Sequence, residues 1–595
     1  MNKPGAPGRP GAADPGTAIR LNPLYYYRVS SFRRALVWLG GFTSAAFLVG
    51  RLWWIQIHHP EPLINAGNAR SVRHYEFQQA RGLITDRLGK ILAISLPAKS
   101  VSADPQVLNQ YGFAQNHAIL ARLSELTHTD IATLKARLGD PTRRYAPLHP
   151  HLDPDKAKEI EDLHLPGITF SDCYQRFYPA GEMCAPLIGI LDNEGRGVSG
   201  IEQSFNSYLT PEVTLLQGHK DRYNHVVENL GVIRQGGIGH QLELSIDSRL
   251  QSAAFEALGA AVQEHQAESA GAVLLDVRSG EILAMASYPS FDPNDRQHYD
   301  SMLAINHAIS DTFEPGSTLK PLVALAVLQS RQVSWNETLD TRPFKVDGKL
   351  VQDSHPMSQA TLNDIIKYSS NTGMARLAMR AGPQRVLDLL LSLGFGHKSQ
   401  LGLSGEHPGS LKEQRRFWSE IDKATLGYGY GVAVTILQLA QAYATLASGG
   451  LQVPVSILRR QRPPQPLRVI NRSEDLRMLA AMESVVAGGT GKQAAIDRYR
   501  VAGKTGTAII ATHGGYQENR YVSSFAGLAP LSDPRFALVV VVRNSRQGGH
   551  FGGQVSGPVF RSVMGRALQL YNVPPDVHVA QAPDGVTGAF REGGY

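Results

Sequence analysis

A long apolar run occupies residues 35–57, ALVWLGGFTSAAFLVGRLWWIQI. As a helix, these residues would span about 34 Å, which is enough to cross one bilayer. Arg51 is the only charge in the run, and it lies near the far end, where its side chain can reach the headgroups. Basic residues precede the run, so we expect a cytoplasmic N-terminus and a chain that lies outside the membrane after His58. No small-x-small cleavage site follows, which favours a retained anchor over a cleaved signal peptide.

The pattern beyond the anchor changes at the glycine cluster Gly236, Gly237 and Gly239. Residues 58–236 mix short apolar runs with Gly and Pro breaks, whereas the chain from 237 to 573 reads as one long α/β unit. We therefore divide the chain into a cytoplasmic tail, an anchor, two outer domains and a C-terminal tail. Both tails are expected to be disordered, and the N-terminal one is rich in Pro and Gly. The predicted bounds are 1–34, 35–57, 58–236, 237–573 and 574–595.

The second outer domain shows both periodicities of regular structure. Residues 241–246 alternate like a strand, and 248–266 have apolar residues at helical spacing. The segments 272–276 and 281–286 flank a turn and predict a hairpin. Three further strands are predicted at 501–508, 523–529 and 536–542, followed by a helix at about 556–571. This order predicts an α/β (α+β) fold, with an antiparallel sheet flanked by helices.

Composition narrows the class of protein. A chain of 595 residues is too long for one core, and its net charge of +7 is modest. Much of the positive excess lies in the first 34 residues, so it indicates membrane orientation and not nucleic-acid binding. The two cysteines, Cys173 and Cys184, cannot form a zinc ligand set, and neither a metal nor another cofactor is expected. They are either two free thiols or one disulfide in an oxidising compartment.

The first chemical element is Ser317-Thr318-Leu319-Lys320, which follows Pro315-Gly316. An apolar helical pattern begins here, so Ser317 is predicted at a helix N-terminus, where developing negative charge is stabilised. Lys320 lies one turn further on and can accept the serine proton if its pKa is lowered. The alternative is a helix-capping serine beside a solvated lysine, and the motif alone is weak.

The second element is Ser369-Ser370-Asn371, which matches the pattern S-x-N. A hydroxyl at 369 can relay a proton to a leaving amine, and the Asn371 amide can hold a substrate backbone. The pattern also occurs at 204–206 and at 334–336. The first of these precedes the serine motif and the second follows it too closely to fold back on it. The plain alternative for Ser369 is an ordinary helix cap.

The third element is Lys504-Thr505-Gly506-Thr507, on the predicted strand 501–508. Gly506 would leave room for an acyl donor beside the strand. The backbone N–H of Thr507 could form an oxyanion hole with that of Ser317. Lys504, Thr505 and the Thr507 hydroxyl could recognise a carboxylate. The alternative is a surface lysine on an edge strand.

The order SxxK, SxN, KTG is characteristic of serine β-lactamases and penicillin-binding proteins. The chain resembles the class B penicillin-binding proteins, and within them the division-specific (septal) peptidoglycan D,D-transpeptidases of Gram-negative bacteria. Further blocks that resemble this family include residues 81–87, 176–182, 197–202, 427–450, 525–530 and 551–560. The resemblance covers roughly residues 35–571. The two cysteines and the proline-rich N-terminal tail are not part of the family pattern.

This resemblance implies a penicillin-binding transpeptidase domain, a periplasmic pedestal of the dimerisation type and a serine acyl-enzyme. Ser317 would attack the D-Ala–D-Ala bond of a peptidoglycan stem peptide, with Lys320 as base. Ser369 and Asn371 would handle the leaving and entering amines, and Lys504, Thr505 and Thr507 would bind the terminal carboxylate. β-Lactam antibiotics would acylate Ser317. Implied partners are a membrane glycan polymerase and other division proteins.

Several alternatives stay open at this point. An elongation-type transpeptidase shares the same motifs, and a D,D-carboxypeptidase differs only in its acceptor, water. A serine β-lactamase would need a glutamate placed to activate water, which the sequence does not identify. A bifunctional synthase would need a glycosyltransferase domain for which residues 58–236 leave too little room. The intact motifs argue against an inactive β-lactam-binding scaffold, but not against an additional scaffolding role.

Overall fold

The structure is a computed structural model, and it describes residues 30–62, 64–65, 72–77, 79–220, 226–412, 415, 417–512 and 515–577. The chain forms two compact units. The first unit comprises residues 1–74 and 217–231, and the second comprises 75–216 and 232–595. The predicted disorder of the two tails falls almost wholly outside the described residues.

The anchor helix α1 spans Ser31–Trp53 and continues as a π-helical turn over Trp54–His58. It therefore begins four residues before the predicted run, because Ser30 caps it and accepts a hydrogen bond from the Arg33 backbone at 3.3 Å. None of its residues is buried. Within the described residues, Ser31–His58 is the single helix long and apolar enough to cross a membrane, by length and composition.

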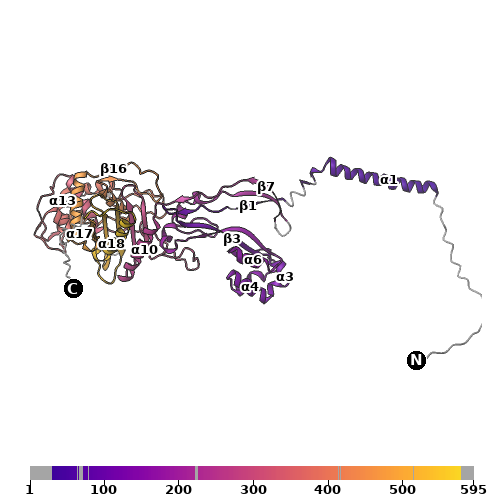
Figure 1. The fold of residues 1–595 in the computed structure, drawn as a ribbon, viewed down its shortest axis with the longest axis horizontal. Helices are drawn as coiled ribbons and strands as arrows, with labels where there is room; N and C mark the ends of the chain where they lie inside the picture. The colour runs from indigo at the N-terminus through magenta and orange to yellow at the C-terminus, as the bar shows by residue number, and fades with distance from the viewer. Residues whose placement is uncertain are drawn as a thin grey trace, which may run out of the picture. The chain divides into compact units, whose positions relative to one another are not determined.

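Residues 72–234 form a mixed α+β region, as predicted. The strands β1, β6 and β7 form a three-stranded sheet in that order, whereas β4, β3, β2 and β8 (Leu242–Glu243) form a second sheet, in which β5 also pairs with β3. Helices α3, α4 and α6 lie together beside β3 (Figure 1). The strands are β1 (Val72–Phe77), β2 (Ile84–Thr85), β3 (Ile91–Ala103), β4 (Ala146–Leu152), β5 (Ile168–Phe177), β6 (Thr214–Lys220) and β7 (Val226–Arg234). The helices are α3 (Pro105–Gln110), η2 (Phe113–Gln115), α4 (His117–Thr127), α5 (Ile131–Leu138), α6 (Pro154–Glu161), η3 (Gly181–Cys184), α7 (Ala185–Ile188), α8 (Gly200–Ser204) and α9 (Asn206–Leu209).

Three sequence blocks of this region meet in one buried ion cluster. Glu202 is fully buried, and its two carboxylate oxygens accept hydrogen bonds from Arg81 Nε and Arg176 Nε, each at 2.7 Å. Arg81 also donates to the Glu202 backbone carbonyl at 2.9 Å. Both arginines are at most 8% exposed. The blocks at 81–87, 176–182 and 197–202 thus each supply one member of a network that fixes the region.

We expect Glu202→Ala to destabilise the protein by about 3–5 kcal/mol, because it leaves two buried guanidinium groups without a counter-charge. The midpoint of thermal unfolding measures this effect. A matched control is Glu194→Ala, which breaks an exposed ion pair with Arg196 and should leave the midpoint unchanged. Equal midpoints for Glu202→Ala and the unchanged protein would contradict the structural role of the cluster.

The two cysteines are free thiols. Cys173 lies on β5 opposite Ala98, and its thiol donates weakly to the Pro150 carbonyl at 3.5 Å. Cys184 lies in the turn η3 and is 1% exposed within the apolar core. Of the two alternatives that the sequence left open, the structure therefore has the free thiols. Burial raises the pKa of Cys184 to about 12, which makes this thiol unreactive at neutral pH.

The larger domain is built on a five-stranded antiparallel sheet in the order β10-β9-β19-β18-β17. The strands are β8 (Leu242–Glu243), β9 (Ser269–Asp276), β10 (Ile282–Tyr288), β11 (Leu339–Asp340), β12 (Phe344–Val346), β13 (Lys349–Val351), β14 (Gln359–Ala360), β15 (Leu451–Gln452), β16 (Leu467–Arg468), β17 (Ala502–Thr512), β18 (Gly515–Ala529) and β19 (Phe536–Arg543). The helices are α10 (Ser248–Glu264), η4 (Gly316–Leu319), α11 (Lys320–Gln329), α12 (Leu362–Lys367), α13 (Asn371–Ala381), α14 (Pro383–Ser392), α15 (Glu420–Leu426), α16 (Ile436–Ala447), α17 (Arg472–Gly488), η5 (Lys492–Ala494) and α18 (Gly552–Leu570).

The predicted antiparallel sheet with flanking helices is confirmed, and so are the hairpin, the three C-terminal strands and the helix that starts at 248. Two details differ. The strand predicted at 241–246 is only Leu242–Glu243, and it pairs in parallel with β2, so it extends the sheet of the preceding region. The last helix begins at Gly552, four residues before the predicted start. Two glycines there weaken the helical signal of the sequence.

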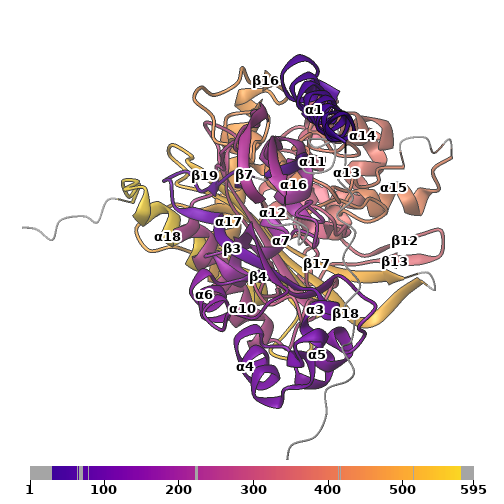
Figure 2. The same ribbon diagram turned by 90° about the vertical axis from the view of Figure 1, so that its right-hand side faces the viewer.

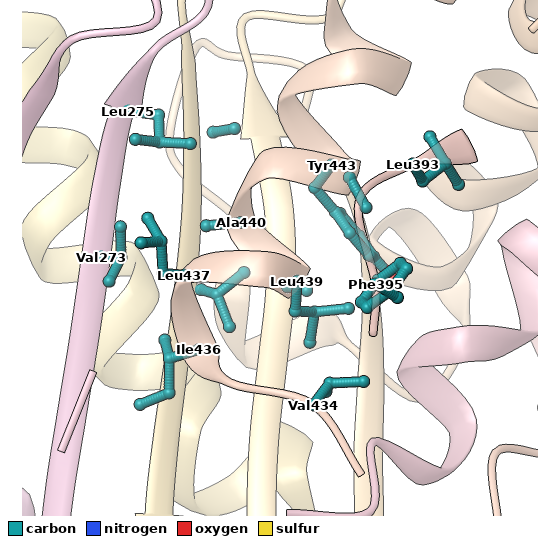
Figure 3. Close-up of a cluster of buried hydrophobic side chains, with 14 of the residues drawn as sticks. Val273, Leu275, Leu393, Phe395, Val434, Ile436, Leu437, Leu439, Ala440 and Tyr443 are labelled. Carbon is teal, nitrogen blue, oxygen red and sulfur yellow. The ribbon is translucent and has the colours of Figure 1, made fainter. Parts of the chain in front are cut away.

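Successive residues of the sheet point to opposite faces, and both faces are covered. Ala272 and Leu274 of β9 belong to one apolar cluster with residues of α10 and α18. Val273 and Leu275 belong to a second cluster with residues of α16. Figure 2 shows α10, α16 and α18 around the strands. Figure 3 shows Ile436, Leu437 and Ala440 of α16 turned toward Val273 and Leu275, with Leu439 and Tyr443 turned toward Leu393 and Phe395. The buried strands explain the apolar run FALVVVV at 536–542.

Among the residues that the structure describes, one carboxyl group in this core has no hydrogen-bond partner on either oxygen. Asp475, in the first turn of α17, is fully buried, and neither of its carboxylate oxygens has a hydrogen-bond partner. Burial raises the pKa of Asp475 to about 8, against the nearby positive charge of Arg468. Because the folded protein holds this proton more tightly than the unfolded chain, the contribution of Asp475 to stability is lost as pH rises from about 4 to about 8.

We therefore expect Asp475→Asn to stabilise the protein by roughly 1–3 kcal/mol at pH 8 and to have little effect near pH 4. Thermal unfolding at several pH values measures the difference. The exposed acid in the first turn of α6, Asp155, gives the matched control Asp155→Asn. A pH-independent difference between Asp475→Asn and the unchanged protein would contradict the expected titration.

Candidate active site

Ser317 lies in the short turn η4, directly before α11. The predicted helix start is therefore a 3₁₀ turn, and the α-helix itself begins at Lys320. Tyr443 of α16 is fully buried, and its hydroxyl donates to the Thr318 carbonyl at 2.7 Å. The turn also packs tightly against Gly429, where a Cβ atom would lie 2.0 Å from the Gly316 carbonyl oxygen. Ser317 is half-buried on this fixed turn.

Lys320 is fully buried, so the alternative of a solvated lysine is wrong. Its Nζ donates to the Ser369 carbonyl at 2.6 Å, the Ser369 Oγ at 3.1 Å and the Asn371 Oδ1 at 2.7 Å. Burial lowers the pKa of Lys320 well below its usual value, and the charge of Lys504 lowers it further, whereas Asp353 opposes the shift. An amine with a lowered pKa can act as a base near neutral pH.

Ser369 lies in the turn between α12 and α13, with a left-handed backbone φ of +58°. Such a conformation costs about 1–3 kcal/mol in a non-glycine residue and is concentrated at functional sites. The helix cap of α13 is Ser370, whose side chain accepts a hydrogen bond from the Gly373 backbone at 3.0 Å. The alternative that Ser369 is an ordinary cap is therefore wrong.

Lys504 of β17 is fully buried as well, so it is not a surface lysine. Its Nζ donates to Ser369 Oγ at 2.9 Å and to the Thr505 carbonyl at 3.1 Å. Burial lowers the pKa of Lys504 to about 7. The hydroxyl of Ser369 thus lies between two buried amines from separate elements, Lys320 on α11 and Lys504 on β17. This arrangement brings the three sequence motifs into one site.

The strand β17 is the last strand of its sheet, and its outer edge is paired with no other described strand. The Thr507 hydroxyl accepts a hydrogen bond from the Gly552 backbone at 3.1 Å, and the Thr505 hydroxyl lies 2.8 Å from that of Thr490. A Cβ atom on Gly316 would lie 3.4 Å from the Thr507 carbonyl oxygen. Thr507 therefore lies beside the turn that bears Ser317.

Close packing explains why position 506 is a glycine. A Cβ atom at this position would lie 2.3 Å from Ser524 Oγ and 2.8 Å from Thr318 Cγ2. The glycine therefore allows β17 to pack against the chain's own η4 turn and β18. Its predicted role of leaving room for an acyl donor stays a prediction.

The S-x-N pattern at 204–206 has a structural role. Ser204 Oγ accepts a hydrogen bond from the Ser404 backbone at 2.8 Å, and Asn206 Oδ1 accepts one from the Gly197 backbone at 2.9 Å. These contacts support the exclusion of this pattern by motif order. Sequence reasoning missed Asp353, whose carboxylate binds the residues next to Ser369. No pattern in the sequence marks it, because it is a single aspartate in a loop.

Among the residues that the structure describes, no group of three or more His, Cys, Asp and Glu side chains could hold a metal ion.

Two family models match the chain. Residues 270–565 match the penicillin binding protein transpeptidase domain, and residues 77–244 match the penicillin-binding protein dimerisation domain. The peptidoglycan D,D-transpeptidase FtsI of Escherichia coli K12 is 39% identical over 548 residues, which cover 92% of this chain and 93% of that protein. The chain belongs to the class B penicillin-binding proteins.

Other penicillin-binding proteins match over similar lengths. The probable peptidoglycan D,D-transpeptidase PbpC of Pseudomonas aeruginosa is 36% identical, covering 90% of this chain and 94% of its own length. The crystal structure of a peptidoglycan synthetase from Bifidobacterium adolescentis has a TM-score of 0.67 at 26% identity and covers 85% of this chain and 97% of that one. The transpeptidase domain of penicillin-binding protein 3 from Burkholderia pseudomallei is 36% identical, with a TM-score of 0.51, and covers 56% of this chain and 97% of its own.

Proposed function

We propose that this class B penicillin-binding protein is the peptidoglycan D,D-transpeptidase of the division septum. The observation that supports this most directly is the placement of Ser369 between the buried amines of Lys320 and Lys504, next to the turn of Ser317. Three motifs separated by long stretches of sequence form one serine acyl-transfer site. The relatives named as D,D-transpeptidases, FtsI among them, supply the substrate and the septal role.

In the acylation step, neutral Lys320 accepts the proton of Ser317 Oγ, and Oγ attacks the carbonyl carbon of the penultimate D-Ala. The backbone N–H groups of Ser317 and Thr507 stabilise the oxyanion. The C–N bond then breaks, and Ser369 relays a proton to the leaving amine, so that D-Ala departs. The product is an ester between Ser317 and the stem peptide.

In the second step, the amine of a neighbouring stem peptide attacks this ester. Asn371 holds the amine, and Ser369 relays the proton of the amine to Lys320. The bond between the acyl carbon and Ser317 Oγ then breaks, and Lys320 returns a proton to Oγ. A β-lactam would acylate Ser317 in the same way, but its ring-opened product would block the acceptor. The free edge of β17 can pair with an extended peptide, because an edge strand offers unpaired backbone groups.

The roles of Lys504, Thr505 and Thr507 in carboxylate binding give a test that uses substrate chemistry. We expect that amidating the terminal carboxylate of a D-Ala–D-Ala donor peptide lowers kcat/KM at least about tenfold in the unchanged protein. In Thr505→Val the same amidation should cost less, because one recognising hydroxyl is already absent. The measurement is D-Ala release from both peptides. Equal discrimination by the two proteins would remove Thr505 from this role.

The location follows from the anchor. We propose that the protein lies in the inner membrane, because α1 is long and apolar enough to span a membrane by length and composition. We propose a cytoplasmic N-terminus and a periplasmic site, with a membrane glycan polymerase and other division proteins as partners of the anchor and the region 58–236. Reporter fusions at either end of α1 test the orientation. A reporter active only outside the membrane should work after residue 62 and fail before residue 30.

The elongation-type function is the second candidate, because both types share the motifs. The FtsI relatives favour the septal role. Depletion of the protein from cells should give filaments, whereas rounded cells would show that it serves the lateral wall. The acyl-transfer chemistry would stand in either case.

A further inference from the structure

Asp353 lies in the loop between β13 and β14, outside the three motifs. Its carboxylate accepts four hydrogen bonds from the start of α13. Oδ1 binds the backbone N–H groups of Asn371 at 2.5 Å and Thr372 at 2.8 Å. Oδ2 binds the hydroxyl groups of Ser370 at 2.5 Å and Thr372 at 2.7 Å. A single remote carboxylate therefore holds three successive residues of the SxN turn.

This contact is more than a helix cap. The cap of α13 is already present, because Ser370 accepts from the Gly373 backbone. Asp353 binds the two backbone N–H groups that precede that one, and a carboxylate there also suits the positive end of the helix. The turn needs such support, because Ser369 has the unfavourable left-handed conformation.

Lys320 contacts the same turn. Asn371 joins Asp353 to the amine directly: its backbone N–H donates to Asp353, and its side-chain Oδ1 accepts from Lys320 Nζ at 2.7 Å. Lys320 Nζ also donates to the carbonyl and hydroxyl oxygens of Ser369. A displaced turn would therefore displace both the proton relay and the partners of the base.

We propose that Asp353 is a positioning residue for acylation: its carboxylate holds the turn of Ser369 and Asn371 against Lys320, and its negative charge acts on the buried amine of Lys320. The proposal rests on the proposed acyl-transfer function. The charged groups that act on Lys320 are Lys504 from β17 and Asp353 from this loop, and their effects on its pKa are opposite. Loss of the Asp353 charge would lower the pKa of Lys320 further.

The test is the pH dependence of covalent labelling by a fluorescent penicillin, measured on the purified full chain. The rate should fall on the acid side as Lys320 gains its proton. In Asp353→Asn the acid limb should move to lower pH, since the protonated amine has lost its favourable charge. The rate at its optimum should fall at least about tenfold, because the turn is held less accurately.

Asp353→Glu separates charge from placement. It keeps the charge but moves the carboxylate by one methylene, so labelling should slow while the acid limb stays near its original pH. The matched control is Asp364→Asn, which removes the carboxylate of the capping box on the neighbouring helix α12. That variant should keep both the rate and the acid limb.

The following results would overturn the positioning role of Asp353. A folded Asp353→Asn with the original rate and acid limb overturns the proposal. So does a slower rate with an unmoved limb that Asp364→Asn reproduces, since this shows a general loss of structure. If Asp353→Asn does not fold, a folded Asp353→Glu that labels at the original rate overturns it equally. Failure of the unchanged protein to label at Ser317 would instead remove the proposed function.

Discussion

Replacement of Ser317 by alanine should abolish covalent labelling by a fluorescent penicillin. The hydroxyl is the proposed nucleophile, and no ester can form without it, so the acylation rate should fall by at least about 10⁴-fold. Ser317 is half-buried on a turn fixed by Tyr443 and Gly429. The substitution removes one oxygen atom, and we expect the fold to be unchanged. Gel fluorescence and the intact mass of the protein measure the label.

Ser330→Ala is the matched control for this experiment. Ser330 caps the other end of α11, where its hydroxyl donates to the Val327 carbonyl. This variant should label at the original rate. Persistent labelling of Ser317→Ala would show that another residue is the nucleophile. Rapid release of the label from the unchanged protein would indicate β-lactamase activity.

The parts of the fold that could be predicted are those with a strong local pattern. The strand at 536–542 is a continuous apolar run buried on both faces, and the helix starting at 248 has a regular apolar stripe. The predicted bounds were wrong where the sequence pattern was weak or mixed. Two glycines concealed the start of α18, and the short strand β8 finds its partner in β2, far away in the sequence. Such long-range pairing is not encoded in a local period.

For the candidate site too, local motifs could be predicted from the sequence, whereas burial and contacts could not. Motif order singled out Ser317, Ser369 and Lys504, and the structure brings their elements together. The sequence could not indicate that Lys320 is fully buried and bonded to Ser369 and not to Ser317 in this state. Burial of a charged group depends on every element packed around it, so it appears only in three dimensions.

The contacts of Asp353 could not be predicted from the sequence either. It is one aspartate among many in the sequence, and its four hydrogen bonds depend on a loop placed by the short hairpin β12–β13. The converse holds for Gly506, where the motif was identified but its packing role was not. Residues that act on other residues of the chain are therefore the ones that motif reading misses.

Lys320→Arg should lower the acylation rate by about 10²–10⁴-fold and remove the acid limb that the titration of Lys320 gives to the pH profile below pH 9. In the unchanged protein, burial and the charge of Lys504 hold the pKa of Lys320 well below its usual value. The rate should therefore rise with pH as the amine loses its proton. Arginine stays protonated throughout this range and cannot accept the serine proton.

Lys367→Ala provides the comparison for Lys320→Arg. Lys367 ends α12 two residues before Ser369, and its Nζ lies over the ring of Tyr368, 5.1 Å from the ring centroid. The Lys367→Ala substitution removes a nearby positive charge and leaves Lys320 in place. Both the acylation rate and the acid limb of its pH profile should therefore be retained. A Lys320→Arg variant that labels at the original rate with the original pH profile would show that Lys320 is not the base. Since Lys504 is the other buried amine bonded to Ser369, that result would pass the role of base to Lys504.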